Sequence, residues 1–127
     1  MYPIISKWTI LDHFRDEAIA ALKALVIKVQ QAEPDTWAYT VHTPDFNQPS
    51  LPTPAAGEVI FFEIYKDEAA FLSHVSGPVF TDFVATFGDM FLSSHGRPYT
   101  TLEIMIQEAG FFRPNCRLIF NQYKQSK

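Results

Sequence analysis

The stretch that decides the fold is Glu58-Val59-Ile60-Phe61-Phe62-Glu63-Ile64-Tyr65, followed at once by Lys66-Asp67. It contains no glycine or proline and consists mostly of β-branched and aromatic residues, a composition typical of a strand. Alternate side chains of a strand point to opposite faces of the sheet. Both faces of this stretch are apolar apart from Glu63, so we expect protein to cover the strand on both sides.

Hydrophobic patterns on either side of this stretch predict the remaining elements. We expect further strands over Pro3–Leu11, Thr36–His42 and Thr100–Gln107, a helix over Phe14–Glu33, and a second helix that starts at Lys66-Asp67, breaks at Ser76-Gly77-Pro78, resumes at Val79 and ends near Gly88. Asp12 is a plausible N-cap of the first helix, and Pro34 ends that helix because its ring cannot continue the backbone ladder. This order predicts an α+β, ferredoxin-like β-α-β-β-α-β fold with an antiparallel sheet.

The sheet of such a fold carries its helices on one face, whereas the central strand is apolar on both. The bare face must therefore meet something, and a second copy of the same sheet is the economical solution. We accordingly expect a homodimer. The chain is also rich in aromatic residues, at 15%, which fits either a large aromatic-lined pocket or an oligomer interface.

Composition excludes several classes of protein. The chain has 127 residues, of which 47% are hydrophobic and 19% charged, so it can form one well-packed domain. Its net charge is −4 and it has no basic block, so nucleic acid and anionic membrane are poor candidates as partners. One cysteine, Cys116, excludes an internal disulfide framework. No signal peptide or membrane-spanning run is evident, and we expect a cytoplasmic protein.

Two stretches carry a resemblance to a known family. Glu33–Tyr39 and Phe62–Phe71, the second continuing through His74 to Pro78 and Phe80, together resemble the antibiotic biosynthesis monooxygenase (ABM) family of the dimeric α/β-barrel superfamily. The resemblance implies a dimeric α/β barrel with a hydrophobic pocket between sheet and helices in each subunit. We expect residues 1–109 to form the ABM-like domain. Residues 110–127 would form a tail or arm that could cross to the partner, and residues 117–120 within it could form an edge strand.

The resemblance specifies the fold more closely than the reaction, because members of this family differ in their chemistry. Characterised members oxygenate quinol- or anthrone-like substrates with O₂ and no bound cofactor, others degrade haem, and one branch isomerises a phosphorylated sugar derivative. The haem-degrading branch has a Trp and a His ten positions apart, with an Asn on the first strand. Here those positions are His74 and Val84, and the first strand has no Asn, which argues against haem degradation.

His74 is the first candidate for a catalytic residue. It shares a helical face with Phe71 and Val75, the face that should meet the sheet. An imidazole there could take a proton from a phenolic substrate, because its pKa lies near working pH. The alternative is a partly buried structural histidine that is hydrogen-bonded to a backbone carbonyl or to Glu63.

A substrate pocket would be formed by Trp8, Tyr39, Glu63, Tyr65, Phe71 and Phe80. Strand aromatics can stack on a flat substrate, although each could equally be part of the core or of a dimer interface. Glu63 must find a partner or stay neutral, and could orient His74 or hold a loop backbone. Arg97 could bind an anionic group at the pocket mouth. No histidine pair has metal-ligand spacing, so no metal or other cofactor is expected.

These observations lead to three hypotheses about function. The first is a cofactor-independent monooxygenase that acts with O₂ on a small aromatic or quinol-like compound. The second is an isomerase of a small polar metabolite, which would need cations in the pocket. The third is a non-catalytic dimer that binds a small ligand, and a pocket filled by its own Phe side chains would favour it.

Overall fold

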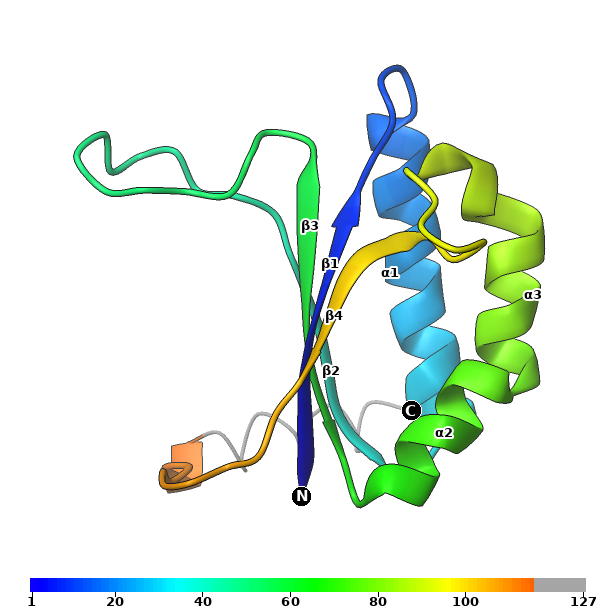
Figure 1. Cartoon of the computed structure of the whole chain (residues 1–127), viewed down its shortest axis with the longest axis vertical. Helices are drawn as coiled ribbons and strands as arrows, with labels where there is room; N and C mark the ends of the chain where they lie inside the picture. Colours follow the sequence, from blue (N-terminus) through cyan, green and yellow to red (C-terminus); the bar gives the residue numbers. More distant parts are fainter. Residues whose placement is uncertain (116–127) are drawn as a thin grey trace.

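The computed structural model describes residues 1–115, so Cys116 and the predicted edge strand over residues 117–120 lie outside the described part. Its elements are β1 (Tyr2–Thr9), α1 (Arg15–Ala32), β2 (Thr36–His42), β3 (Glu58–Tyr65), α2 (Glu68–Ser76), α3 (Pro78–Phe87), a 3₁₀ turn η1 (Gly88–Met90) and β4 (Tyr99–Ile104). The strands form one antiparallel sheet in the order β2-β3-β1-β4, and the helices all lie on one side of it (Figure 1). The predicted ferredoxin-like α+β fold is confirmed.

The core lies between the sheet and the helices. Strand β3 runs beside both β1 and β2, with Trp8 opposite Val59 and Tyr39 opposite Glu63. Every second residue of β3 turns toward the helices and is buried: Val59, Phe61, Glu63 and Tyr65. The sequence pattern placed Phe61, Glu63 and Tyr65 on one face, and the structure confirms this.

Helix α1 packs on the sheet through a stripe of residues spaced three and four apart, namely Ala18, Ala21, Leu22, Leu25 and Val29. The predicted N-cap was wrong. Phe14 occupies the N-cap position without a side-chain hydrogen bond, whereas Asp12 lies two residues earlier. His13 between them has a φ of 78°, so the chain turns there before the helix begins. The helix ends before Pro34, as expected.

The second helical region breaks where the sequence indicated. The carboxylate of Asp67 caps α2 by accepting a hydrogen bond from the amide of Ala70 at 2.9 Å. Gly77 then separates α2 from α3, and Pro78 stands in the first turn of α3, where its missing N–H costs nothing. A Cβ at position 77 would lie 2.6 Å from the carbonyl oxygen of Ser73, so the tight break requires glycine.

Two strand ends differ from the prediction. Strand β1 ends at Thr9 and β4 ends at Ile104, whereas the patterns extended them to Leu11 and Gln107. Beyond Thr9, Ile10 makes only an isolated bridge to Phe91. In the antiparallel pair, Ile4 lies opposite Ile104, and β1 begins only two residues earlier, at Tyr2. Residues soon after Ile104 therefore have no β1 backbone to pair with.

The opposite face of the sheet carries no helix. The loop of residues 43–57 and the segment after β4 both extend on that side (Figure 1). Several apolar side chains on or beyond this face are exposed, among them Phe62 at 38%, Ile106 at 83% and Phe111 at 73%. Within residues 1–115, no helix is long and apolar enough to cross a membrane.

Candidate functional site

His74 lies at the centre of the helix–sheet interface. It projects from α2 and is 3% exposed, and its ring centroid is 5.2 to 5.5 Å from those of Tyr39, Tyr65 and Phe80. Its Nδ1 is 2.7 Å from Oε1 of Glu33, a hydrogen-bonded pair that links α2 to the end of α1. Its Nε2 has no hydrogen-bond partner among the described residues. One ring nitrogen is therefore held by a carboxylate while the other is left free.

Glu33 is the partner that sequence reasoning missed, because it considered Glu63 or a backbone carbonyl instead. Pro34 ends α1 and leaves Glu33 in a non-helical conformation with φ −125° and ψ 80°. The Thr36 hydroxyl also donates to Oε1 at 3.0 Å, which fixes the carboxylate from a second side. A signal was present in the sequence, because Glu33 follows Val29 by four residues and so continues the buried stripe of α1.

Glu63 is paired with Tyr65 and not with a loop backbone. The Tyr65 hydroxyl donates to Oε1 of Glu63 at 2.6 Å, and Glu63 is 4% exposed. Burial raises the pKa of Glu63 to about 7, against the lowering effects of the Tyr65 hydrogen bond and of His74. Burial, together with the charge of Glu63, also raises the pKa of Tyr65 and of Tyr39 well above 10. Both phenols therefore remain protonated donors at neutral pH.

A small cavity of about 10 Å³ lies beside His74. It is lined by Ser6, Trp8, Tyr39, Glu63, Phe71, His74, Val75, Phe80, Tyr99 and Leu102, a set that includes every predicted site residue except Tyr65. Tyr65 packs next to it, 5.4 Å from the Phe71 ring. The folding chain thus brings the predicted residues together, but the space between them is large enough for only about one water molecule.

The aromatic side chains themselves fill this region. Trp8 stacks on Phe61 with centroids 4.6 Å apart and meets Phe80 edge-on. Its indole N–H donates to Ser6 Oγ at 2.7 Å, so its polar group is already satisfied. An aromatic ligand cannot enter unless these side chains move.

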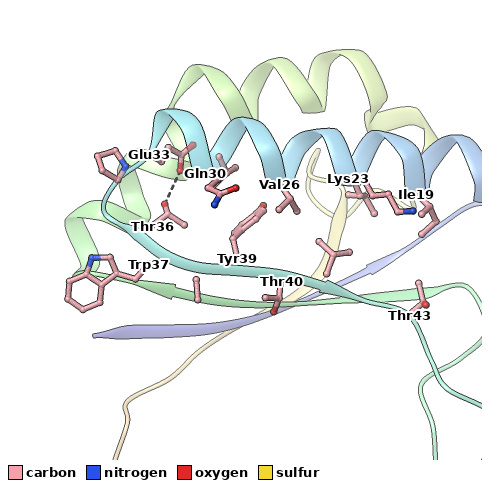
Figure 2. A pocket seen from close by; sticks show the side chains of 15 residues that line it. Ile19, Lys23, Val26, Gln30, Glu33, Thr36, Trp37, Tyr39, Thr40 and Thr43 are labelled. Atoms are coloured by element: carbon pink, nitrogen blue, oxygen red, sulfur yellow. Dashed lines mark hydrogen bonds between the residues drawn. The ribbon is translucent and has the colours of Figure 1, made fainter. Parts of the chain in front are cut away.

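A much larger cleft of about 800 Å³ opens between α1 and the edge strand β2 (Figure 2). Residues from both elements and from the turn between them line it, including Ile19, Lys23, Val26, Gln30, Glu33, Thr36, Trp37, Tyr39, Thr40, Val41 and Thr43. Two residues connect the cleft to the buried centre. Tyr39 lines both the cleft and the small cavity, and Glu33 lines the cleft while holding His74.

The remaining polar candidates stay outside both spaces. Arg97 is exposed and donates to the Tyr99 hydroxyl at 2.7 Å, but it lines neither the cleft nor the small cavity. His13, His42 and His95 are exposed. The part of the chain that the structure describes contains no cluster of three or more His, Cys, Asp or Glu side chains placed to hold a metal ion.

The arrangement can perform proton transfer. A histidine whose Nδ1 is hydrogen-bonded to a carboxylate is held in one orientation, which leaves Nε2 to accept a proton. An open cleft beside it provides the volume that a small molecule needs.

Comparisons with known proteins agree with this fold. The chain is 22% identical to a crystal structure described as antibiotic biosynthesis monooxygenase, with a TM-score of 0.66 over 86% of this chain and 100% of the other. Rv0793 from Mycobacterium tuberculosis is 21% identical, with a TM-score of 0.62 over 86% and 98%. A conserved protein from Methanosarcina mazei Go1 is 14% identical, with a TM-score of 0.65 over 84% and 92%. At these identities the likeness concerns the fold.

Comparison with curated protein sequences gives no match. The family model described as antibiotic biosynthesis monooxygenase, however, matches residues 1–86, which is more than half of the chain. That match includes β1 through most of α3, and with them the pair formed by Glu33 and His74. The chain therefore belongs to the antibiotic biosynthesis monooxygenase family.

Proposed function

We propose that this protein is a cofactor-independent monooxygenase that acts with O₂ on a small aromatic or quinol-like compound, with His74 as the general base. The observation that carries this proposal is the 2.7 Å contact between His74 Nδ1 and Glu33 Oε1 in a buried aromatic setting. It leaves Nε2 as the basic atom, next to a cavity of water-molecule size. Membership of the family supports the reaction class, and the pair of His74 and Glu33 gives it a chemical basis.

The reaction begins with loss of a phenolic proton, which passes to Nε2 through one water in the small cavity. The resulting anion is electron-rich and transfers one electron to O₂, which gives a substrate radical and superoxide. These combine in a carbon–oxygen bond, which gives a peroxide anion at a carbon that still carries a hydrogen. The imidazolium returns its proton to this anion, which becomes a hydroperoxide. Loss of water from that hydroperoxide, formed from its terminal hydroxyl and the hydrogen on the carbon, leaves a carbonyl group, so one oxygen atom of O₂ enters the product and the other leaves as water.

Glu33 is a positioning residue in this scheme. Its carboxylate orients the imidazole and stabilises the imidazolium that forms. The protonated phenols of Tyr39 and Tyr65 lie within 5.5 Å of His74, measured between ring centroids, and add no negative charge to the centre at neutral pH. The negative charge that develops on the substrate therefore meets no further phenolate.

Oxygen uptake tests the proposal. Anthrones and dihydroquinones are offered in metal-free buffer to the wild type, to His74→Gln and to the control His42→Gln, which removes an exposed histidine. Removal of a general base lowers the rate by about 10²- to 10⁴-fold, so uptake should collapse in His74→Gln and persist in the control. Equal rates in all three proteins would remove His74 from the mechanism. No uptake with any compound would contradict the oxygenase itself.

We also propose a homodimer in which the bare sheet faces of two chains meet. The exposed Phe62 on that face, and the exposed Ile106 and Phe111 beyond it, support this proposal. Phe62→Asp should convert the dimer to a monomer in sedimentation analysis. Ile27→Asp, which alters an exposed residue of α1, should leave the mass unchanged. A wild-type monomer at micromolar concentration would contradict the arrangement.

One observation favours a second function, a dimer that binds a small ligand without catalysis. The space around His74 holds about one water and is filled by Trp8, Phe71 and Phe80, as the third sequence hypothesis anticipated. Binding in the α1–β2 cleft with no oxygen uptake would support this function. The isomerase has less support, since Arg97, its expected cation, lines neither space and Lys23 is the one cation that lines the cleft within residues 1–115.

A further inference from the structure

The α1–β2 cleft differs chemically at its two ends. At one end lie Glu33, Thr36 and Trp37, and at the other lie Lys23, Ile19 and Thr43 (Figure 2). Between them, Val26 and Gln30 of α1 lie opposite Tyr39 of β2. Lys23 and Glu33 are ten residues apart on or next to one helix, which places them about 15 Å apart along its axis.

Both end groups are available to a ligand. Glu33 engages His74 and Thr36 through Oε1 alone, its side chain is 18% exposed, and Oε2 has no partner within residues 1–115. Lys23 is exposed and forms no salt bridge among the described residues. The cleft thus offers a hydrogen-bond acceptor at one end, a cation at the other, and mostly apolar walls between them, with Gln30 and Thr40 as the polar exceptions.

We infer that this cleft binds an elongated, planar aromatic compound that carries a hydroxyl group at one end and a carboxylate at the other. The hydroxyl lies against Glu33 and Tyr39, the carboxylate meets Lys23, and the rings lie between Val26 and the β2 side chains. Charge complementarity sets this direction, because a carboxylate at the Glu33 end would face another carboxylate. The role of this ligand as substrate rests on the proposed function, whereas its binding does not.

The arrangement also explains how a ligand too large for the small cavity can react at His74. The hydroxyl end stops at the two residues that separate the cleft from the buried centre, and the one-water cavity lies behind Tyr39. Lys23 then selects substrates by their far end. It acts in binding and takes no part in the proton transfer.

The two tryptophans of the chain distinguish the two spaces. Trp37 lines the cleft and is 51% exposed, whereas Trp8 lines the small cavity and is 1% exposed. In ¹⁵N-labelled protein each indole N–H gives its own resonance, and Trp37→Phe identifies which is which. Titration with 6-hydroxy-2-naphthoate should shift the Trp37 resonance and leave that of Trp8 in place. A shift confined to Trp8 would overturn the inference.

Matched compounds and variants test the direction of binding. Lys23→Gln should weaken the binding of 6-hydroxy-2-naphthoate by about two- to five-fold, the effect of one exposed ion pair. The same variant should leave the binding of 2-naphthol unchanged. Lys28→Gln, which removes an exposed lysine of the same helix outside the cleft, should have no effect. If Lys23→Gln and Lys28→Gln weakened binding equally, or if Lys23→Gln weakened the binding of both compounds equally, the assignment of Lys23 would be overturned. A Trp37 resonance that responds to protein concentration but not to ligand would show a second copy in the cleft and would also overturn it.

The result separates this inference from the proposed function. Binding at Trp37 without oxygen uptake would support the cleft and contradict the oxygenase. Uptake with no shift at Trp37 would support the oxygenase and contradict the cleft.

Discussion

The pH dependence of stability gives the sharpest test of the buried centre, through Glu63. Glu63 is 4% exposed, and the pKa of its carboxyl group rises from an ordinary 4.5 to about 7 in the folded chain. The main cause is burial, which disfavours the charged form. Between pH 4.5 and 7 the folded chain therefore holds a proton that the unfolded chain has lost.

The sign and size follow from linkage. Because Glu63 binds its proton more tightly in the folded state, its contribution to stability is fully present below pH 4.5 and is lost as the pH rises through about 7. The full shift from 4.5 to about 7, at roughly 1.4 kcal/mol per pH unit, corresponds to about 3.5 kcal/mol, of which about 3 kcal/mol falls between pH 4.5 and 8. The contribution becomes constant at about one pH unit above 7.

Glu63→Gln isolates this contribution, since the amide keeps an oxygen for the Tyr65 hydroxyl and cannot ionise. Urea unfolding is followed from pH 4.5 to 8 at one protein concentration, for the wild type, Glu63→Gln and the control Glu103→Gln, whose side chain is 47% exposed. The free energy of unfolding of the wild type minus that of Glu63→Gln should fall by about 3 kcal/mol across the range. A difference that does not change with pH, or that changes equally in the control, would refute the argument from burial.

Two further predictions concern the helices. Asp67→Ala removes the N-cap of α2 and should lower the free energy of unfolding by about 1 kcal/mol. Asp12→Ala should change it by less than about 0.5 kcal/mol, because Asp12 caps no helix. Equal losses of the two variants in urea unfolding would contradict the assignment of the caps. Gly77→Ala places a Cβ 2.6 Å from the carbonyl oxygen of Ser73 and should destabilise the chain by about 1 to 3 kcal/mol, so an unchanged melting temperature would show that the break between α2 and α3 can relax.

The fold could be predicted where the local sequence pattern agrees with what packing in the folded chain requires. The strands over Thr36–His42 and Glu58–Tyr65 match the predicted bounds. Pro34 and Pro44 flank the first, whereas Gly57 precedes the second and the helix cap Asp67 follows it. The break at Gly77 was predictable for the same reason. Asp12 failed as a cap because residue preference alone does not show that His13 turns the chain. The ends of β1 and β4 failed because they depend on where a partner strand stops.

The candidate site could be predicted in its members and not in its contacts. Spacing on α2 placed His74 on the face that meets the sheet, and alternation placed Glu63 and Tyr65 together. The partner of His74 is 41 residues away in sequence, and nothing local distinguishes Glu33 from Glu63 as that partner. The available volume was not predictable either, because it depends on how side chains from several elements fill the same space.

The sequence by itself therefore determined the element order, the ferredoxin-like plan, the family and the residues that gather at the centre, because periodicity and residue preference act over a few positions. The tertiary structure decided the rest. It paired His74 with Glu33, filled the space around them with Trp8, Phe71 and Phe80, and opened the cleft between α1 and β2. These features are set by close packing between segments distant in sequence, where a shift of a few ångströms decides whether two groups form a hydrogen bond or line a cavity.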